Sequence, residues 1–481
     1  MKYLPRKSHL LLWSVFHALL FVTGISQAAP SRPNIIFFYA DDMGYGDLAC
    51  YGSEVAQTPR IDQLAAEGTR FTQFYVSNCV CSPTRASAIT GQFPSRHQIC
   101  GYVSFFEQNE KRHMPNWLDV EAASFPRVLQ QAGYRTGLIG KWHLGGGSGS
   151  TFRITDLKKP DVDTSGRTEI VVNHPDAPPV VDYGFHHARI SAGNGLTWKK
   201  AKPWPEPHDK YPYVETEWLT WSSRAIADDS IQFLDDHVAS HKEDPFYLNV
   251  WFKDVHTPFK PTDEMLAPFT ELDEKARDHY AMLKYMDGQI GRVLDRLDDL
   301  GMSKNTLVIF SSDNGAGRRR GGSNGHFRGW KHMLYEGGIR VPLIMRWPAG
   351  AVQAGRVDET SVVNICDFVP TFSELTGVKM PEGYESDGES FSTAMKGKTF
   401  ERTKAQYWYY PSAKVKLAMR SGDWKLLANP NGDSVELYDL ASDPEESSNL
   451  TGENPEVTAR LKHSLLDWYA QTPVGRKAVM N

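Results

Sequence analysis

The stretch NIIFFYADD, residues 34–42, decides the fold, because seven uncharged residues lead directly into two aspartates. A nearly continuous apolar run of this length is typical of a strand that is buried on both faces. Three further runs, at residues 136–140, 246–252 and 306–310, share this character, and each leads into polar residues that can do chemistry. Strands of this kind belong to parallel or mixed sheets covered by helices on either side, so we expect such a sheet here.

Amphipathic helices are predicted between these strands. The clearest ends at Gly301 and carries its apolar residues at three- and four-residue spacing, namely Met282, Leu283, Met286, Ile290, Val293, Leu294 and Leu297. Strands that alternate with helices indicate an α/β fold with a large, mixed but mainly parallel sheet sandwiched by helices. In such folds ligands bind beyond the carboxyl ends of the strands, which is where all four runs deliver polar residues. We therefore expect the functional site at that edge of the sheet.

The chain changes character after about residue 365. Three short segments with strand-like composition, at residues 418–420, 424–427 and 435–438, are separated by turn residues, and a helix is predicted after Asn454. This pattern predicts a small C-terminal α+β subdomain with an antiparallel sheet.

We therefore expect a catalytic domain over residues 29–365 and the C-terminal subdomain over residues 366–481. Residues 145–225, within the catalytic domain, are rich in Gly, Pro, Asp, His and Trp. Such composition is typical of an elaborated surface region, and we expect this region to flank the site on the substrate side.

Residues 1–28 are predicted to be a signal peptide. Lys2, Arg6 and Lys7 precede an apolar segment at residues 10–25, and small residues then allow cleavage after Ala28. The alternative is a membrane anchor, but the segment is short and its far flank is cleavable. We therefore expect an exported protein, periplasmic or secreted, without membrane insertion.

Composition excludes several other classes of protein. The 481 residues are 40% hydrophobic and 12% aromatic, which excludes a disordered, collagen-like or coiled-coil chain. A mean hydropathy of −0.45 excludes a polytopic membrane protein. The formal net charge is −5 and becomes −8 once the three basic residues of the signal peptide are removed, so nucleic acid is not an expected partner. An anionic substrate would have to be attracted by a local patch.

Five cysteines are present, at positions 50, 79, 81, 100 and 366. An odd number in an exported protein requires a reason for the cysteine left over. One or two disulfides are compatible with the sequence, which does not decide their pairing.

Asp41, Asp42, Asp313 and Asn314 follow two of the predicted strands. Their oxygen atoms suit Ca²⁺ or Mg²⁺, whereas a zinc site would favour His and Cys. Taken alone, either Asp41-Asp42 or Asp313-Asn314 would more often be a turn or capping element. Because both pairs lie at equivalent strand ends, we favour a metal site.

The stretch CSPTR, residues 81–85, is the most informative motif. Ser82 is a good helix cap and Pro83 a good first helical residue, which places Cys81 near a helix N-terminus that favours anions. Arg85, four residues on, can share a face of the helix with Cys81. Cys81 could be a buried structural cysteine or a nucleophile, but a soft thiolate is a poor partner for a hard cation.

CSPTR followed by TGQ at residues 90–92 resembles the signature of the type I, formylglycine-dependent sulfatases. Other stretches resemble that family in its order, and they are residues 41–44, 140–145, 256–259, 312–315, 329–331 and 336–342, with 437–440 and 443–445 near the C-terminus. The resemblance implies an alkaline phosphatase-like fold, sulfate ester hydrolysis, and oxidation of Cys81 to formylglycine by a maturase. The hydrate of that aldehyde has an oxygen nucleophile, which removes the mismatch between sulfur and a hard cation.

The same resemblance implies residue roles. Asp41, Asp42, Asp313, Asn314 and the converted Cys81 would bind one Ca²⁺, which is favoured over Mg²⁺.

Arg85 would stabilise the hydrate, while Lys141 and Lys331 would bind the sulfate oxygens. His256, helped by Lys331, would protonate the departing oxygen, and His143 would remove a proton from the remaining hydroxyl to expel sulfate. This matches the chemistry, since attack on a sulfate ester needs fixed positive charge and a poor leaving group needs an acid.

The substrate is expected to be a sulfated saccharide or polysaccharide fragment. Arg319 lies in a three-arginine run after the predicted metal residues and is a candidate for binding a further anionic group, although such runs are often solvated loops. Aromatic residues of the elaborated region, Trp198, Trp204 and Trp218, support a saccharide over a small aryl sulfate. Two rival functions are a phosphonate or phosphate ester hydrolase of the same superfamily and a non-catalytic binder of sulfated glycans.

Overall fold

The computed structural model describes residues 1, 32–104, 106–145, 150–153, 169–172, 177–191 and 215–480. The predicted signal peptide lies outside these ranges apart from its first residue, as does most of the predicted elaborated region, with Trp198 and Trp204. Across the described ranges, no helix combines the length and apolar character needed to cross a membrane.

A mixed sheet of eight strands is the centre of the part of the chain that the structure describes, in the order β11-β2-β10-β9-β1-β8-β4-β7. The strands are β1 (Asn34–Ala40), β2 (Thr69–Phe71), β4 (Arg135–Lys141), β7 (His187–Ser191), β8 (Phe246–Trp251), β9 (Thr306–Ser312), β10 (Leu343–Arg346) and β11 (Arg356–Asp358). All are parallel except β10, which is antiparallel to β2 and β9. The predicted fold class is therefore confirmed.

Strand β1 lies at the middle of the sheet, hydrogen-bonded to β8 on one side and β9 on the other. Ile36 faces Leu248 and Val308 across these pairings. Alternate residues of β1 enter different cores, with Phe37 in one and Phe38 in the other, and both are buried. The strand reads as continuously apolar because both of its faces are covered.

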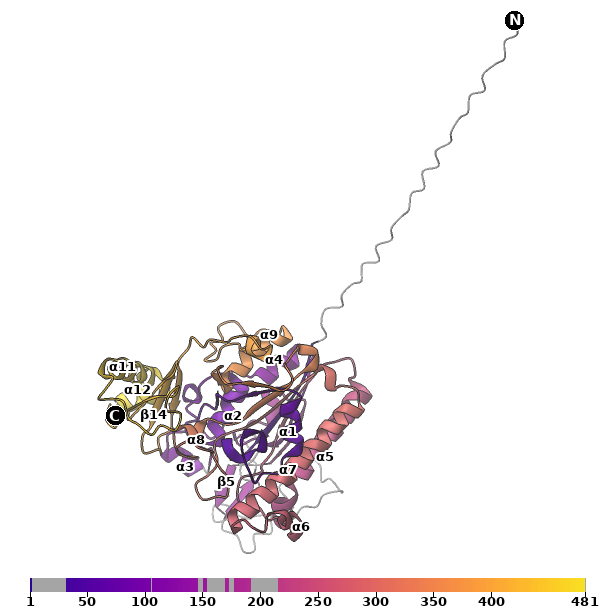
Figure 1. The fold of residues 1–481 in the computed structure, drawn as a ribbon, viewed down its shortest axis with the longest axis horizontal. Coiled ribbons are helices and arrows are strands. Elements are labelled where there is room, and N and C mark those ends of the chain that lie inside the picture. The colour runs from indigo at the N-terminus through magenta and orange to yellow at the C-terminus, as the bar shows by residue number, and fades with distance from the viewer. Residues whose placement is uncertain are drawn as a thin grey trace. The chain divides into compact units, whose positions relative to one another are not determined.

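Helices cover each face of the sheet (Figure 1). The core that contains Phe38 is closed by α1 (Pro59–Ala66), α5 (Glu215–Ser240) and α7 (Glu274–Asp299), and α5 and α7 lie side by side. The core that contains Phe37 is closed by α2 (Cys81–Thr90), α4 (Phe125–Gln131) and α9 (Phe368–Thr376). Every apolar position predicted for the helix that became α7 is buried.

The C-terminal subdomain contains an antiparallel four-stranded sheet. Its strands are β13 (Gln406–Tyr409), β14 (Leu417–Ser421), β15 (Trp424–Ala428) and β16 (Glu436–Asp439), and α11 (Pro455–Gln471) packs on the sheet. The predicted meander and final helix are present, and β13 and the short α12 (Pro473–Met480) join them. The predicted boundaries at residues 28/29 and 365/366 stay predictions.

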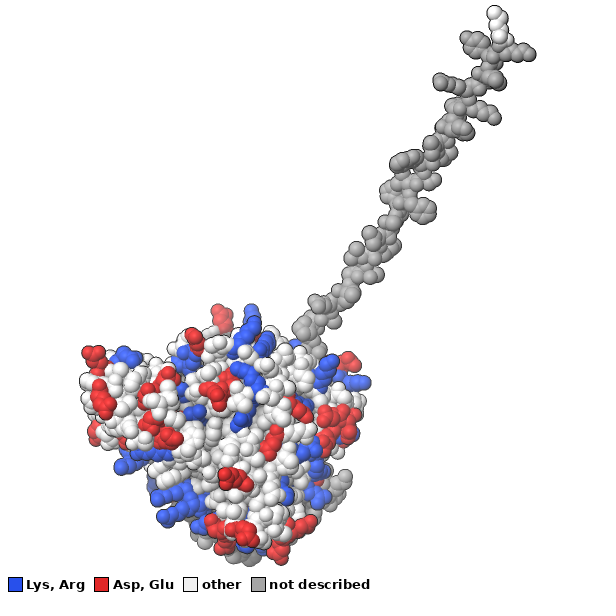
Figure 2. Space-filling view, viewed as in Figure 1, with Lys and Arg blue, Asp and Glu red and all other residues white. Residues whose placement is uncertain are grey.

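Short elements complete the described chain. They are α3 (Phe106–Lys111), α6 (Asp263–Leu266), α8 (Glu336–Ile339), α10 (Ser392–Met395), and the paired strands β3 (Phe74–Tyr75) with β12 (Val363–Asn364) and β5 (Ser150–Arg153) with β6 (Glu169–Val172). Figure 2 shows basic and acidic side chains interspersed in small groups over the face in view.

A buried charged cluster joins β15 to α8. Lys425 Nζ lies 2.8 Å from a carboxylate oxygen of Glu336 and 2.8 Å from one of Glu446, and all three side chains are fully buried. Burial raises the pKa of Glu446 to about 7, against the effect of Lys425 and with a contribution from Glu336. Two carboxylates thus share one lysine, and ionising the second is unfavourable.

The five cysteines all lie in the described ranges and none is in a disulfide. Burial raises the pKa of Cys50, Cys79, Cys100 and Cys366, so these thiols are protonated at neutral pH.

Candidate active site

Two neighbouring strands bring the predicted oxygen ligands to one edge of the sheet. Because β1 and β9 are parallel, with Ala40 opposite Ser312, the residues that follow each strand meet. The Asp313 amide donates to the Ala40 carbonyl at 3.2 Å, and the Asp42 amide donates to Oδ1 of Asp313 at 3.2 Å. The backbone therefore fixes both pairs of ligands.

The chain turns sharply at Asp42, whose φ of 61° lies in the left-handed region that non-glycine residues rarely adopt. Such strain persists only where the surrounding structure holds it, and it clusters at functional sites. Here the side-chain amide of Asn314 donates through Nδ2 to Oδ1 of Asp42 at 2.8 Å, and Lys331 Nζ donates to the same oxygen at 2.5 Å.

The donor set fits a hard divalent cation. Asp41 Oδ1 and Asn314 Oδ1 are buried and accept no hydrogen bond from any residue that the structure describes. Leaving a buried acceptor unsatisfied costs about 1–3 kcal/mol, which a bound cation would remove. Asp41, Cys81 and Asp313 also offer ligand atoms within 4.8 Å of one another. Carboxylate and amide oxygens are the ligands that Ca²⁺ and Mg²⁺ prefer.

Cys81 is the first residue of α2 and is 2% exposed. Its Sγ lies 3.6 Å from Lys141 Nζ and 3.9 Å from Lys331 Nζ. Burial raises the pKa of the Cys81 thiol to about 11, although both lysines oppose this. The unmodified side chain is therefore a neutral thiol at pH 7.

The prediction that Ser82 caps this helix was wrong. The residue before the helix is Val80, which supplies no side-chain cap, and Ser82 lies within the first turn. Ser82 Oγ instead accepts a hydrogen bond from the Val103 amide at 2.9 Å, which ties the loop before α3 to the start of α2.

Arg85 lies one turn into α2 and is completely buried. Its Nε and a terminal nitrogen donate to Oδ2 of Asp313 at 3.0 and 2.7 Å, and its other terminal nitrogen donates to the Lys141 carbonyl at 2.8 Å. The guanidinium also lies over the rings of Tyr39 and Trp251. Arg85 thus links the helix of Cys81 to the ends of β9 and β4.

Lys141 ends β4, and its ammonium group donates to Oδ2 of Asp41. Burial alone would raise the pKa of Asp41, but Lys141, His256 and Arg85 overcome this and lower it. Burial would similarly lower the pKa of Lys331, and the Asp42 carboxylate raises it instead. Lys331 is therefore positively charged, and both lysines are paired with carboxylates beside Cys81.

His143 follows Lys141 by two residues and is 7% exposed, with a φ of 56°. Its Nε2 lies 3.1 Å from the Val103 carbonyl, which can only accept, so Nε2 carries the hydrogen. Its Nδ1 is buried and has no hydrogen-bond partner within the described ranges. Burial, with Lys141, lowers the pKa of His143, so the ring is neutral at pH 7 with its lone pair on Nδ1.

His256 follows β8. Its Nδ1 lies 2.5 Å from the Thr257 carbonyl and therefore carries a hydrogen, while Nε2 lies 3.4 Å from Oδ2 of Asp42. Burial lowers the pKa of His256 to about 4, although Asp42 opposes this.

A pocket of about 460 Å³ opens over these groups. Of the predicted site residues, Asp42, Cys81, His143, His256 and Lys331 line it. The structure thus brings the predicted metal, cysteine, lysine and histidine groups into one place.

The pocket has further lining residues that were not individually named as site residues from the sequence: Tyr102, Thr257, Gly317, Arg318, Arg320, Trp330 and His332. Of these, only Tyr102 and His332 lie outside the stretches that the sequence singled out. The Arg318 guanidinium lies 4.5 Å from the centre of the Trp330 ring, and His332 Nδ1 is 2.7 Å from the Tyr410 hydroxyl. Arg319 is exposed and is not among the lining residues, whereas the arginines on either side of it are. Trp330 and His332 are the sequence neighbours of the predicted site residue Lys331, and this adjacency could have indicated that they line the same pocket.

Comparison with known proteins identifies the family. The Sulfatase family model matches residues 33–378, and a model described as N-sulphoglucosamine sulphohydrolase, C-terminal, matches residues 322–471. An N-acetylgalactosamine-6-O-sulfatase of Bacteroides thetaiotaomicron is 28% identical over 90% of this chain and 92% of its own. Arylsulfatase A of Homo sapiens is 30% identical over 92% of this chain and 89% of its own.

A solved structure, Ps i-CgsB in complex with k-i-k-neocarrahexaose, aligns with a TM-score of 0.74 and 24% identity over 92% of this chain and 94% of its own. The chain belongs to the sulfatase family and shares its alkaline phosphatase-like fold. It is a sulfuric ester hydrolase.

Proposed function

We propose that the protein hydrolyses sulfate monoesters of a sulfated saccharide, using formylglycine made from Cys81 and one bound Ca²⁺. The observation that carries this proposal is the environment of Cys81, whose sulfur lies beside two lysines and the clustered aspartates. A neutral thiol is a weak nucleophile and a poor ligand for a hard cation, so these neighbours suit an oxygen at this position better than a sulfur.

Asp41, Asp42, Asp313 and Asn314 would hold the cation, together with the converted side chain at position 81. When bound, the cation would polarise a sulfate oxygen and offset charge that develops during the reaction. Oδ1 of Asp41 and Oδ1 of Asn314, which are buried and accept no hydrogen bond from the described residues, support this assignment.

Lys141 and Lys331 bind the sulfate group of the substrate, since both ammonium groups lie within 4 Å of the position 81 side chain. Their positive charges are fixed before substrate arrives, so little reorganisation is needed when negative charge grows on the sulfate oxygens. Arg85 holds Asp313 and the end of β4 in place around them.

His256 supplies the acid and His143 the base. The Thr257 carbonyl orients His256 so that Nε2 faces the pocket, where an anionic substrate would raise its affinity for a proton. One hydroxyl of the formylglycine hydrate, ionised beside the bound cation, would attack sulfur and break its bond to the sugar oxygen. Nε2 of His256, with Lys331 nearby, would protonate that departing oxygen. The lone pair on His143 Nδ1 then takes the proton from the hydroxyl at position 81, which releases sulfate and restores the aldehyde.

The substrate class follows from the walls of the pocket. Arg318 and Arg320 add positive charge beyond the sulfate-binding lysines, and Trp330 offers a ring against which a sugar can pack. The named relatives include an N-acetylgalactosamine-6-O-sulfatase, and the solved neighbour holds a neocarrahexaose. We infer a sulfated saccharide with a further anionic group, bound by Arg318 or Arg320 rather than by the predicted Arg319, which does not line the pocket.

Peptide mass spectrometry of the segment around position 81 tests the modification. Protein made with a formylglycine-generating maturase should carry the mass of formylglycine at Cys81, and Cys79→Ser should carry it as well, because Cys79 is a buried thiol two residues away with no role in the site. Cys81→Ala should abolish sulfate release. An unmodified Cys81 in active protein would contradict the proposal, and unmodified, inactive protein that binds sulfated glycans would favour the non-catalytic binder.

Matched esters separate the sulfatase from a phosphonate or phosphate ester hydrolase of the same superfamily. We expect kcat/KM for sulfate release from a sulfated saccharide to exceed that for the corresponding phosphate monoester and for a phosphonate ester. The reverse order would assign the second function. Sulfate release across a panel of sulfated saccharides would then identify the sugar.

We also propose that the protein is exported to the periplasm or secreted, from the signal peptide predicted at residues 1–28. Amino-terminal sequencing of protein from a fractionated host should find Ala29 as the first residue. Uncleaved protein in the membrane fraction would support the anchor instead.

A further inference from the structure

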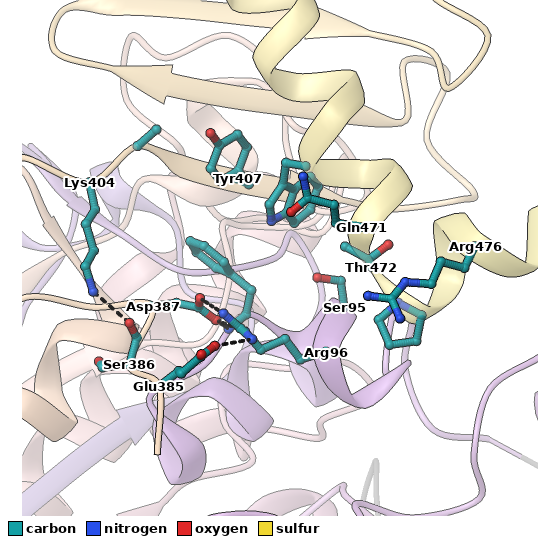
Figure 3. Close-up of a pocket in the computed structure, with 14 residues that line it drawn as sticks. Ser95, Arg96, Glu385, Ser386, Asp387, Lys404, Tyr407, Gln471, Thr472 and Arg476 are labelled. Carbon is teal, nitrogen blue, oxygen red and sulfur yellow. Dashed lines mark hydrogen bonds and ion pairs between the residues drawn. The ribbon is translucent and has the colours of Figure 1, made fainter. Parts of the chain in front are cut away.

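Figure 3 shows a second pocket, of about 900 Å³. Its lining includes Phe93, which follows α2, so the pocket lies beyond the end of this helix that is opposite Cys81. Because α2 has ten residues, its two ends are about 15 Å apart. The wall on the catalytic-domain side includes Phe93 and Arg96, which follow α2, and the facing wall includes Tyr407 and Trp468 of the C-terminal subdomain. No lining residue is shared with the active-site pocket.

Three cationic side chains line this pocket, and two of them have no carboxylate partner in the part of the chain that the structure describes. Arg96 is already neutralised, since it binds both carboxylate oxygens of Asp387 at 2.7 and 2.8 Å and lies 3.4 Å from Glu385. Lys404 donates only to the backbone carbonyls of residues 386 and 388. Arg476 is exposed, and its guanidinium contacts no described acceptor. Against these three cations the lining has two carboxylates, Glu385 and Asp387, so the pocket carries a surplus of one positive charge.

Figure 3 shows Lys404 and Arg476 on opposite sides of Arg96. Two cations on different sides of Arg96 suit a ligand that carries more than one anionic group. A ligand with anionic groups repeated along a chain can contact both, and a sulfate group suits an exposed guanidinium because two of its oxygens can accept a pair of parallel hydrogen bonds.

An aromatic wall stands beside these cations. The rings of Tyr407 and Trp468 are stacked with centroids 4.8 Å apart and planes at 8°, and Phe93 packs edge-on against both. The Tyr407 hydroxyl is fixed by Ser464 Oγ at 3.0 Å. This wall is rigid and only partly buried, so it can pack against the C–H face of a sugar ring with little loss of conformational entropy.

We propose that this pocket is a second binding site for a sulfated oligosaccharide segment, separate from the site of hydrolysis. The inference rests on the proposed function, because it assumes that the substrate is part of a longer sulfated chain. Binding of a distant segment of the same polymer raises the effective concentration of sulfate esters at the active site without any new contact there.

Kinetics on a long and a short substrate test the proposal. We expect Lys404→Ala/Arg476→Ala to raise KM for a sulfated polysaccharide at least fivefold with kcat unchanged, and to leave kcat/KM for 4-nitrophenyl sulfate unchanged. The matched control is Lys398→Ala/Arg460→Ala, which removes two exposed cations outside the pocket; Arg460 lies two turns before Trp468 on α11. The control should behave as the parent on both substrates. An unchanged KM for the polysaccharide in the Lys404/Arg476 variant would overturn the proposal.

Direct binding separates this proposal from the proposed function. A carrageenan hexasaccharide is titrated into Cys81→Ala protein by calorimetry, with the chemically desulfated hexasaccharide as the control ligand. We expect a binding event that is lost in the Lys404/Arg476 variant, that weakens as salt is added, and that the desulfated ligand does not give. If the parent protein releases sulfate from none of the esters but hexasaccharide still binds at this pocket, only the proposed function is refuted. Identical titrations for the parent and the Lys404/Arg476 variant would refute the second site, and Trp468→Ala, checked for a cooperative thermal transition, should reproduce the loss.

Discussion

Removing Arg85 tests whether the buried framework of the active site depends on one guanidinium. The chain offers an internal comparison, since Arg85 and Arg96 each make two hydrogen bonds to one aspartate at similar distances. The Arg85 side chain is 0% exposed, whereas that of Arg96 is 42% exposed. The two aspartates are both shielded, with Asp313 0% and Asp387 9% exposed, so the pairs differ mainly in whether water reaches the guanidinium.

The expected magnitudes differ because of this exposure. Removing one partner of a buried ion pair leaves an uncompensated charge and costs about 3–5 kcal/mol, and Arg85 also gives up its bond to the Lys141 carbonyl. An exposed pair is screened by solvent and contributes about 0–1 kcal/mol. We therefore expect Arg85→Ala to lower the free energy of unfolding by about 3 kcal/mol or more, and Arg96→Ala by no more than about 1 kcal/mol.

The assay is urea unfolding followed by tryptophan fluorescence, at pH 7.5 in EDTA and again with CaCl₂. Ca²⁺ should reduce the penalty of Arg85→Ala, because a dication beside Asp313 replaces part of the lost positive charge. If Arg85→Ala proves too unstable to purify, Arg85→Lys keeps the charge but not the paired donors. Its free energy of unfolding should lie between that of the parent and a value about 3 kcal/mol lower. Equal losses for Arg85→Ala and Arg96→Ala would refute the reasoning.

Three further outcomes are expected. Asp41→Asn should abolish the increase in melting temperature that Ca²⁺ gives the parent, as thermal scans at several Ca²⁺ concentrations would show; a retained increase would exclude Asp41 as a ligand. Because native Glu446 has its pKa raised to about 7, the folded state holds this proton more tightly than the unfolded state, so stability present below pH 4.5 should be lost as pH rises through 7. Glu446→Gln should remove up to about 3 kcal/mol of that decline, and an unchanged pH profile of urea midpoints would count against it. Arg320→Ala should reduce kcat/KM for a sulfated oligosaccharide about tenfold and leave kcat/KM for 4-nitrophenyl sulfate unchanged, whereas Arg319→Ala should leave both values unchanged. Equal losses on both esters for Arg320→Ala would argue against a role in substrate recognition.

The sheet and the edge that carries the site could be predicted because both depend on local sequence. An uncharged run such as residues 34–40 has a single stable environment, a strand covered on both faces, and the residue that ends it must then lie at the carboxyl edge. β13 lacked such a signal, since its four residues alternate between buried and half-buried and could equally have belonged to a loop. The sequence also misplaced the start of α2, because the Ser82 hydroxyl is used by Val103, a partner that only the tertiary fold provides.

The partners of site residues were harder to predict than the residues themselves. Arg85 was expected to act on the neighbouring Cys81, and its principal hydrogen bonds are instead to Asp313, 228 residues away. In the run of three arginines, sequence marks a basic loop but does not tell which side chain faces the pocket, because direction depends on backbone angles such as the positive φ of Arg319. Tyr102 lies on a loop whose sequence carries no catalytic motif, so its place in the pocket depends on the fold alone.

The charges of the site explain how a chain with a formal net charge of −5 can attract an anionic ester. Three carboxylates, from Asp41, Asp42 and Asp313, face three cations, from Arg85, Lys141 and Lys331, so the protein groups alone are close to neutral. The proposed Ca²⁺ would give this buried set a surplus of about two positive charges, in surroundings where charges act strongly because water is excluded. Attraction of sulfate would then be local and dependent on the cation, whereas the second pocket attracts sulfate through Lys404 and Arg476 without a metal. Chelation should therefore abolish sulfate release while leaving hexasaccharide binding at the second pocket intact, and loss of both together would show that the two sites are not independent.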